Sequence, residues 1–220
     1  MFPLYDTARS HKFPIINLTI IAINILAFFY ELQMGSNVEQ FIFQWGLTPG
    51  RFIADPANAW ILIFSSMFLH GGWFHIINNM WVLFIFGDNV EARLGGFRYL
   101  IFYLLSGAAA GLMQVFILSS SDLPMIGASG AIAGVLGAYL VLYPRARVAS
   151  LVPIFFIFTV IEIPAFIYLL FWFVSQLYSG LFAIQGGGAS GIAWWAHIGG
   201  FIFGLVMVSF FRKKTEYRSY

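Results

Sequence analysis

The chain has 220 residues, of which 60% are hydrophobic and only 9% are charged. A soluble domain carries about a quarter charged residues, so the composition indicates an integral membrane protein, and the length suits one membrane domain over residues 1–220. Cysteine is absent, which excludes a disulfide scaffold, a thiol nucleophile and a thiolate metal site, while the formal net charge of +2 says little by itself.

Six segments are long and apolar enough to span a bilayer, and each is expected to be helical because lipid offers the backbone no other hydrogen-bonding partner. They cover residues 14–34, 71–87, 97–117, 127–143, 164–181 and 192–211. The first segment follows Arg9 and Lys12 and so resembles a signal peptide, but no small-x-small cleavage pattern follows it, and we expect a retained first helix. The sequence therefore predicts an all-α bundle of six transmembrane helices.

The placement of the basic residues predicts the orientation of these helices. With six spans, ten of the 11 Lys and Arg residues fall on one side of the membrane, and only Arg51 falls on the other. The ten are Arg9, Lys12, Arg93, Arg98, Arg145, Arg147, Arg212, Lys213, Lys214 and Arg218. The positive-inside rule then places both termini in the cytoplasm. We expect a multi-pass protein of a prokaryotic cytoplasmic membrane.

Residues 35–70 lie between the first two spans and are too many for a tight turn and too apolar for a solvated loop. Trp45 and Trp60 are typical of headgroup depth, and Pro49-Gly50 and Asp55-Pro56 indicate turns. We therefore expect short helices that lie partly in the outer leaflet.

Residues 148–163 are also apolar, but Pro153 and Glu162 interrupt them. A carboxylate at mid-bilayer is costly, and Pro164 disfavours helix in the residue before it. We expect the fifth helix to start at Pro164. The segment before it is predicted to be an irregular connection near the inner face, with Glu162 as a solvated carboxylate rather than a proton relay.

Four polar side chains are expected near the outer ends of three helices. Ser129 begins the fourth helix, His75 and Asn79 lie in the first turns of the second, and His197 lies in the first turn of the sixth. Polar residues at that depth are costly without partners, which makes them functional candidates. His75 and Asn79 are four residues apart and so share a helix face. With the N–H groups at the start of the fourth helix, they would face an oxyanion that develops beside Ser129.

Small residues would let the fourth and sixth helices approach each other closely. Gly130-x-x-x-Gly134 lies on the fourth helix, and Gly200-x-x-x-Gly204 lies on the sixth, on the face that carries His197. If the helices pack through these residues, His197 comes within hydrogen-bonding reach of the Ser129 hydroxyl. A base at that distance is what a serine nucleophile needs.

Each of these features has a plainer interpretation. A serine at a helix start is most often a cap for backbone donors, and either histidine taken alone is as readily a buried packing residue. A metal site is another alternative, since His70 lies near the same face. However, His70 and His75 are five residues apart, which suits a shared helical face poorly, and no carboxylate lies at the same depth. We rank a metal site below nucleophilic catalysis, expect His70 to be interfacial, and give His11 no role.

Taken together, the motifs resemble the rhomboid family of intramembrane serine proteases. The residues that carry the resemblance are Gly127-Ala-Ser129-Gly130, His75-x-x-x-Asn79, Ala196-His197-x-x-Gly200, Met67-Phe-Leu-His70-Gly-Gly, Glu91-x-Arg93-x-Gly95 and Ile163-Pro-Ala165. The resemblance implies a six-helix core in which Ser129 is the nucleophile and His197 is the general base and then the acid. It places His75, Asn79 and the Ser129 N–H in the oxyanion hole, and it implies no metal and no cofactor.

The resemblance also implies a substrate and a route to the site. The family cleaves transmembrane segments of other proteins near the outer interface, so membrane protein substrates and the lipid bilayer are the expected partners, with no nucleic acid. Water must reach a site below the surface, so the loop around residues 118–126 is expected to line a cavity. A substrate helix would approach past the fifth helix, where Trp172 and Gln176 lie one turn apart.

Two positions depart from the family pattern. Many members carry a Trp-Arg pair ahead of the histidine that matches His70, where this chain has Ile61-Leu62. Some members place an aromatic ring one turn after the serine, where the base can rest, and this chain has Ala133 there. The support for His197 is therefore expected from another part of the fold.

Two other classes of protein are rival interpretations. An inactive relative would bind membrane helices without cutting them, and the intact Ser129 and His197 argue against it. A transporter would need a polar path across the bilayer, and the inner halves of the predicted helices offer almost no polar residues.

Overall fold

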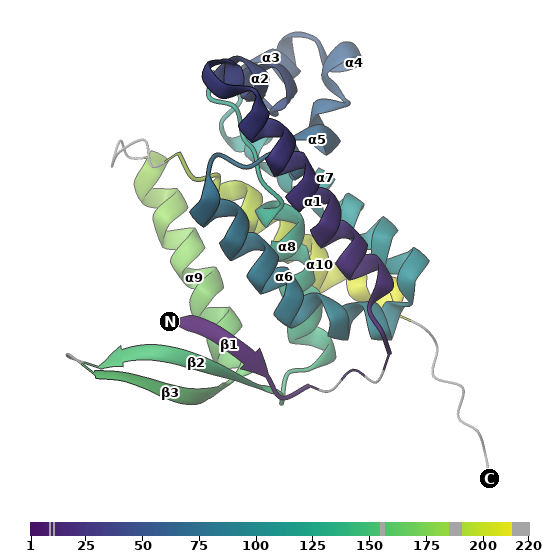
Figure 1. Ribbon diagram of the computed structural model, residues 1–220, viewed down its shortest axis with the longest axis vertical. Helices are drawn as coiled ribbons and strands as arrows, with labels where there is room; N and C mark the ends of the chain where they lie inside the picture. The colour runs from purple at the N-terminus through teal and green to yellow at the C-terminus, as the bar shows by residue number, and fades with distance from the viewer. Residues whose placement is uncertain (9, 11, 155–156, 185–190, 213–220) are drawn as a thin grey trace.

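A computed structural model describes residues 1–8, 10, 12–154, 157–184 and 191–212 of the chain. A helix occupies each of the six segments that the sequence predicts as spans. These helices are α1 (Ile15–Gln33), α6 (Trp73–Leu94), α7 (Gly96–Ile117), α8 (Ser129–Leu142), α9 (Ala165–Ile184) and α10 (Trp194–Phe211). They pack as a bundle, and α6, α8 and α10 begin at the same end of it (Figure 1).

Four of these helices, α1, α7, α9 and α10, are long and apolar enough to cross a membrane. α8 is a shorter apolar helix of 14 residues, about 21 Å long, and α6 carries Asp88, Glu91 and Arg93 in its last two turns. The chain is a multi-pass integral membrane protein, while the count of six spans and the orientation of the termini remain predictions. Four basic residues used for the orientation lie outside the described residues: Arg9, Lys213, Lys214 and Arg218.

Residues 35–70 form short helices, as the sequence predicts. They are α2 (Val38–Trp45), α3 (Pro49–Ala54), α4 (Pro56–Ala59) and α5 (Leu62–Ser65), with 3-10 turns at Gly35–Asn37 and Ser66–Phe68. They lie at the end of the bundle where α6, α8 and α10 begin (Figure 1). Leu47 and Met125 exchange two backbone hydrogen bonds, of 3.0 and 2.9 Å, which join this segment to the loop before α8.

Three strands form an antiparallel sheet at the opposite end of the bundle (Figure 1). They are β1 (Phe2–Asp6), β2 (Arg147–Ile154) and β3 (Ile157–Pro164), in the order β1-β2-β3. The prediction of an all-α fold with an irregular connection over residues 148–163 is therefore wrong. Valine, isoleucine and phenylalanine predominate in this segment and favour extended backbone, and β1 supplies a partner strand from the distant N-terminal region. Glu162 is exposed on the edge strand β3, in agreement with its predicted place outside the bundle interior.

α8 lies at the centre of the bundle and packs against α6, α7, α9 and α10. Its residues Gly130–Tyr139 are all buried. Most of these residues are glycine or alanine, so the neighbouring helices can approach the α8 backbone closely.

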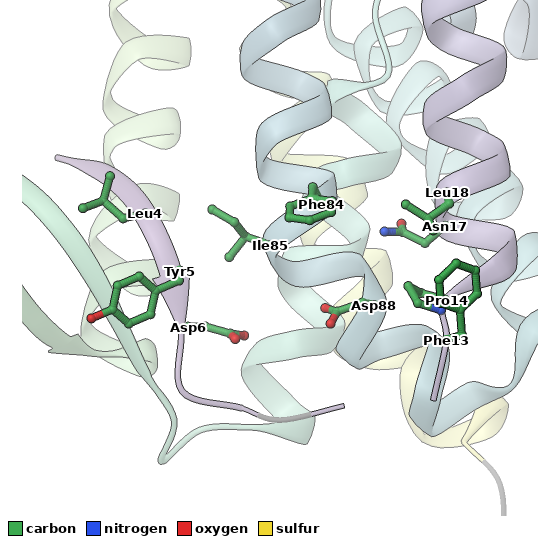
Figure 2. A pocket seen from close by; sticks show the side chains of 10 residues that line it. All are labelled: Leu4, Tyr5, Asp6, Phe13, Pro14, Asn17, Leu18, Phe84, Ile85 and Asp88. Carbon is green, nitrogen blue, oxygen red and sulfur yellow. The ribbon is translucent and has the colours of Figure 1, made fainter. Parts of the chain in front are cut away.

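The side chain of Asp6 fixes β1 against the bundle. Its carboxyl group accepts hydrogen bonds from the Tyr139 hydroxyl of α8 at 2.5 Å and from the Asn89 amide of α6 at 3.0 Å. A cavity of about 370 Å³ lies between β1, α6 and the start of α1. Figure 2 shows the side chains that line it, Asp6 and Asp88 among them. The N-terminal strand thus contacts the end of α8 that lies farthest from Ser129.

The docking of β1 is expected to depend on pH. Burial raises the pKa of Asp6 from 3.8 to about 7; the neighbouring Asp88 adds to this rise, and the hydrogen bonds from Tyr139 and Asn89 oppose it. The protonated form is thus favoured in the docked state, so docking is strongest below the ordinary pKa and weakens as the pH rises through about 7. Protection factors from hydrogen exchange of residues 2–6 should fall over this range. Asp6→Asn should remove that pH dependence. An unchanged pH dependence in this variant would show that Asp6 does not control the docking of β1.

Candidate active site

Ser129 is the first residue of α8. The chain reaches it through Gly127, whose φ of +116° favours glycine and whose N–H donates to the Ser66 carbonyl at 2.8 Å. The cap residue of the helix is Ala128, and no side chain caps this helix start. The Ser129 hydroxyl lies 2.8 Å from Nε2 of His197 instead. The alternative interpretation of Ser129 as a helix cap is therefore wrong.

Close packing of glycines on α8 and α10 brings this pair together. A Cβ atom at Gly200 would collide with the carbonyl oxygen of Gly130, and one at Gly204 would collide with that of Gly134. His197 lies one turn before Gly200 and therefore shares this face of α10. The predicted approach of the two helices through small residues is confirmed.

Gln176 of α9 contacts the other nitrogen of the His197 ring. Its Oε1 lies 2.8 Å from Nδ1 of His197, while its Nε2 donates to the Ser175 hydroxyl at 3.2 Å. This orientation of the amide makes Nδ1–H the donor to Gln176 and leaves Nε2 able to accept the Ser129 proton. Trp172, one turn earlier on α9, places its ring 6.0 Å from the imidazole. These two side chains supply the support that the small residues of α8 do not.

His75 and Asn79 of α6 face the backbone just before Ser129. A Cβ atom at Gly127 would lie 2.6 Å from Nε2 of His75 and 3.6 Å from Nδ2 of Asn79. Nδ2 of Asn79 is buried and has no hydrogen-bond partner among the described residues. A buried donor without a partner is costly, and this one is available to an oxygen atom placed beside Ser129. The fold thus brings the four predicted site residues together.

A cavity of about 140 Å³ opens beside these residues, between α6, α8 and α9. Ser129, His197, Asn79 and Trp172 are among the residues that line it. On another side of Ser129, residues 125–127 line a smaller void of about 10 Å³, whereas the described lining of the 140 Å³ cavity includes no residue of the loop 118–126. The larger cavity of Figure 2 lies at the far end of the bundle, and its lining includes no serine or histidine. Ser129 and His197 therefore both line the 140 Å³ cavity.

His70 is buried inside the protein, and its predicted depth at the membrane interface stays a prediction. It is 1% exposed, and its ring packs edge-on against His75 with the centroids 5.0 Å apart. Burial, and secondarily the neighbouring His75, lowers the pKa of His70 to about 4, so the ring is neutral near neutral pH. Within the described part of the chain, no three histidine, cysteine or acidic side chains are placed to hold a metal ion. His11 lies outside that part.

The chain is similar in sequence to known proteins. The family model described as "Rhomboid domain" matches residues 57–214. "RHOMBOID-like protein 6, mitochondrial" of Arabidopsis thaliana is 34% identical over 43% of this chain and 30% of its own length. The "Putative rhomboid protease YdcA" of Bacillus subtilis (strain 168) is 30% identical over 58% of this chain and 62% of its own length. "Rhomboid protease GluP" of the same bacterium is 34% identical over 58% of this chain and 24% of its own length.

The chain thus spans less than two thirds of the length of these curated relatives. They include bacterial proteins and a plant protein with a mitochondrial name. The similarity therefore does not distinguish the predicted prokaryotic membrane from the membrane of an organelle.

Proposed function

The chain belongs to the rhomboid family, and on that basis we propose that it is an intramembrane serine endopeptidase that cleaves transmembrane segments of other proteins. The observation that carries this proposal is the 2.8 Å contact between Oγ of Ser129 and Nε2 of His197, with Gln176 on the opposite ring nitrogen. A serine hydroxyl is a poor nucleophile by itself, and a base at this distance activates it.

Catalysis begins when Oγ of Ser129 attacks the carbonyl carbon of the scissile peptide and Nε2 of His197 takes the hydroxyl proton. The charge that develops on the carbonyl oxygen is stabilised by Nδ2 of Asn79, by His75 and by the Ser129 N–H. His197 then passes its proton to the leaving amine, and water hydrolyses the acyl-enzyme with His197 again as base. Gln176 is neutral, so its part is to hold the ring in the tautomer that leaves Nε2 able to accept a proton.

The active site lies near the outer face of the membrane, with six spans and both termini in the cytoplasm. The common starting end of α6, α8 and α10 supports this orientation, as does the position of Arg147 in the sheet at the opposite end (Figure 1). At about 21 Å, α8 is shorter than the hydrocarbon core of about 30 Å, so Ser129 at its start can lie below the outer surface.

The substrate is a transmembrane helix that approaches between α9 and α6. The cavity beside Ser129 has Trp172 of α9 and Asn79 of α6 in its wall, and the lipid-facing side of α9 exposes apolar residues such as Phe171 and Val174. A peptide bond must leave its helix to reach the Ser129 hydroxyl. Segments with helix-destabilising residues such as glycine or proline near the outer interface are therefore preferred.

Purified protein in liposomes, incubated with labelled single-span membrane proteins, tests this function. We expect cleavage by the wild type and none by Ser129→Ala. Undiminished cleavage by Ser129→Ala would refute the mechanism. No cleavage of several substrates by the wild type would favour an inactive relative that binds membrane helices.

Removal of the Gln176 acceptor should slow the reaction without weakening substrate binding. Gln176→Leu leaves Nδ1–H of His197 without its partner at 2.8 Å, so the ring loses its fixed orientation. We expect kcat to fall about 10- to 100-fold with little change in KM. This loss is a part of the rate enhancement of about 10²–10⁴-fold that a positioned general base contributes. Gln176→Glu keeps an acceptor oxygen and should retain more activity than Gln176→Leu.

Tyr178→Leu, a change at an exposed position of the same helix, is the control and should cleave at the wild-type rate. Equal rates for Gln176→Leu and the wild type would show that the amide does not orient the base.

A further inference from the structure

Glu31 lies in the last turn of α1 and is buried, with 1% of the residue exposed. Both carboxylate oxygens lie 3.0 Å from the backbone nitrogen of His70, which is 39 residues further along the chain. Within the described part of the chain, this N–H is the one hydrogen-bond donor found on the carboxylate.

This arrangement is a poor source of stability. A carboxylate offers about four lone-pair positions to hydrogen-bond donors, and burial removes the water that would occupy them. A single backbone N–H replaces a small part of that hydration. An apolar side chain of similar size would pack at this position without the loss. The role of Glu31 is therefore better explained by the group that it holds, which is the backbone N–H of His70.

His70 lies next to His75, one of the proposed oxyanion donors. The ring of His70 lies edge-on against the ring of His75, with centroids 5.0 Å apart at an angle of 64°. The ring nitrogens of His70 have no hydrogen-bond partner among the described residues beyond the nearby backbone of Phe68, whereas the backbone N–H of His70 is held by Glu31. Nε2 of His75 in turn faces Gly127, two residues before Ser129.

A second contact of α1 holds the same turn. Phe28, three residues before Glu31, is 3% exposed and packs edge-on against Trp73, with ring centroids 5.0 Å apart. Trp73 is the first residue of α6 and lies three residues after His70. α1 therefore contacts the start of α6 at two successive points, one polar and one apolar.

We propose that Glu31 is a positioning residue for the oxyanion donor His75, a role that rests on the proposed protease function of the same site. By fixing the backbone of His70, it sets the ring of His75 against Gly127. α1 is thereby part of the geometry of catalysis, although it contributes no residue to the cavity beside Ser129.

A double-mutant cycle between Glu31 and His75 tests this role, with the purified full chain in liposomes and a labelled single-span substrate. Glu31→Ala should lower kcat about 10- to 100-fold, with KM changed less than about twofold. Deletion of an oxyanion donor lowers kcat by about 10²–10³-fold, and displacement of the donor should lower it less. Glu31→Gln keeps an acceptor oxygen for the His70 N–H and should recover most of the loss. The double variant Glu31→Ala/His75→Ala should be no slower than His75→Ala alone.

Ile20→Ala is the matched control, since Ile20 is a core residue of α1, 2% exposed, and its loss should lower the thermal midpoint while kcat stays within about twofold. If Glu31→Ala does not fold, Glu31→Asp takes its place. It keeps the carboxyl group but is one methylene shorter, and it should also lower kcat.

A wild-type kcat in Glu31→Ala, or in Glu31→Asp where it replaces that variant, would overturn the role of Glu31. Losses that multiply in the double variant Glu31→Ala/His75→Ala would do the same. If such variants cleave normally while Ser129→Ala is inactive, only this role is refuted. Cleavage by Ser129→Ala would instead refute the proposed function.

Discussion

Replacing Ser129 with alanine should lower the rate of substrate cleavage by about 10⁴-fold or more, and replacing His197 with alanine should lower it by a similar factor. The double variant should be no slower than either single variant, because the hydroxyl and the base, 2.8 Å apart, act on one proton. Measurement of kcat/KM in liposomes with a labelled single-span substrate compares all three variants with the wild type.

Ser106→Ala is the matched control for this loss. Ser106 is also a buried serine, and it lies on α7 next to Gly134. It does not line the cavity that holds Ser129, so the same chemical change should leave kcat/KM near the wild-type value. If the separate losses of the two alanine variants multiplied in the double variant, Ser129 and His197 would not act as a unit.

Gly204→Ala should disrupt both the fold and the reaction. The added Cβ would lie 2.8 Å from Cα of Gly134 and closer still to its carbonyl oxygen. A collision with backbone cannot be relieved by a change of rotamer, so α10 must move away from α8 and carry His197 with it. We expect a loss of stability of about 1–3 kcal/mol, and a fall in kcat of about 10²-fold, since a displacement of about 1 Å at a reacting group costs that much.

Thermal unfolding in detergent and kcat in liposomes measure these two effects. Val206→Leu adds one carbon on the exposed side of the same helix and should change neither quantity appreciably. A Gly204→Ala protein with wild-type stability and activity would show that the contact with Gly134 does not set the distance between Ser129 and His197.

The helices and the central pair of the site could be predicted from local pattern. Long apolar runs in lipid can only be helical, so the segments were recognisable one by one. The periodicity of a helix places His197 on the face of Gly200 and Gly204, and glycines permit backbone contact. These two facts are sufficient to bring the histidine to Ser129, and the 2.8 Å contact agrees with them.

The parts that escaped prediction depend on contacts between distant segments. The run over residues 148–163 has the composition of a strand, but it needs β1 as a partner, and nothing local marks the N-terminal residues as that partner. Gln176 is a conspicuous polar residue in an apolar helix, yet its contact with His197 depends on the rotation of α9 in the bundle. The buried His70 likewise contacts Glu31, which lies 39 residues away.

The central position of α8 also determines how the protein responds to its lipid. Residues Gly130–Tyr139 are buried by neighbouring helices, whereas α1 and α9 expose large apolar side chains such as Phe29 and Phe171. Differences in bilayer thickness act on helices that face lipid, through tilting or local deformation of the membrane. The helix that begins with Ser129 is shielded from this hydrophobic mismatch. A thicker or thinner bilayer should therefore change how readily a substrate helix reaches the site, while the reactivity of the serine stays constant.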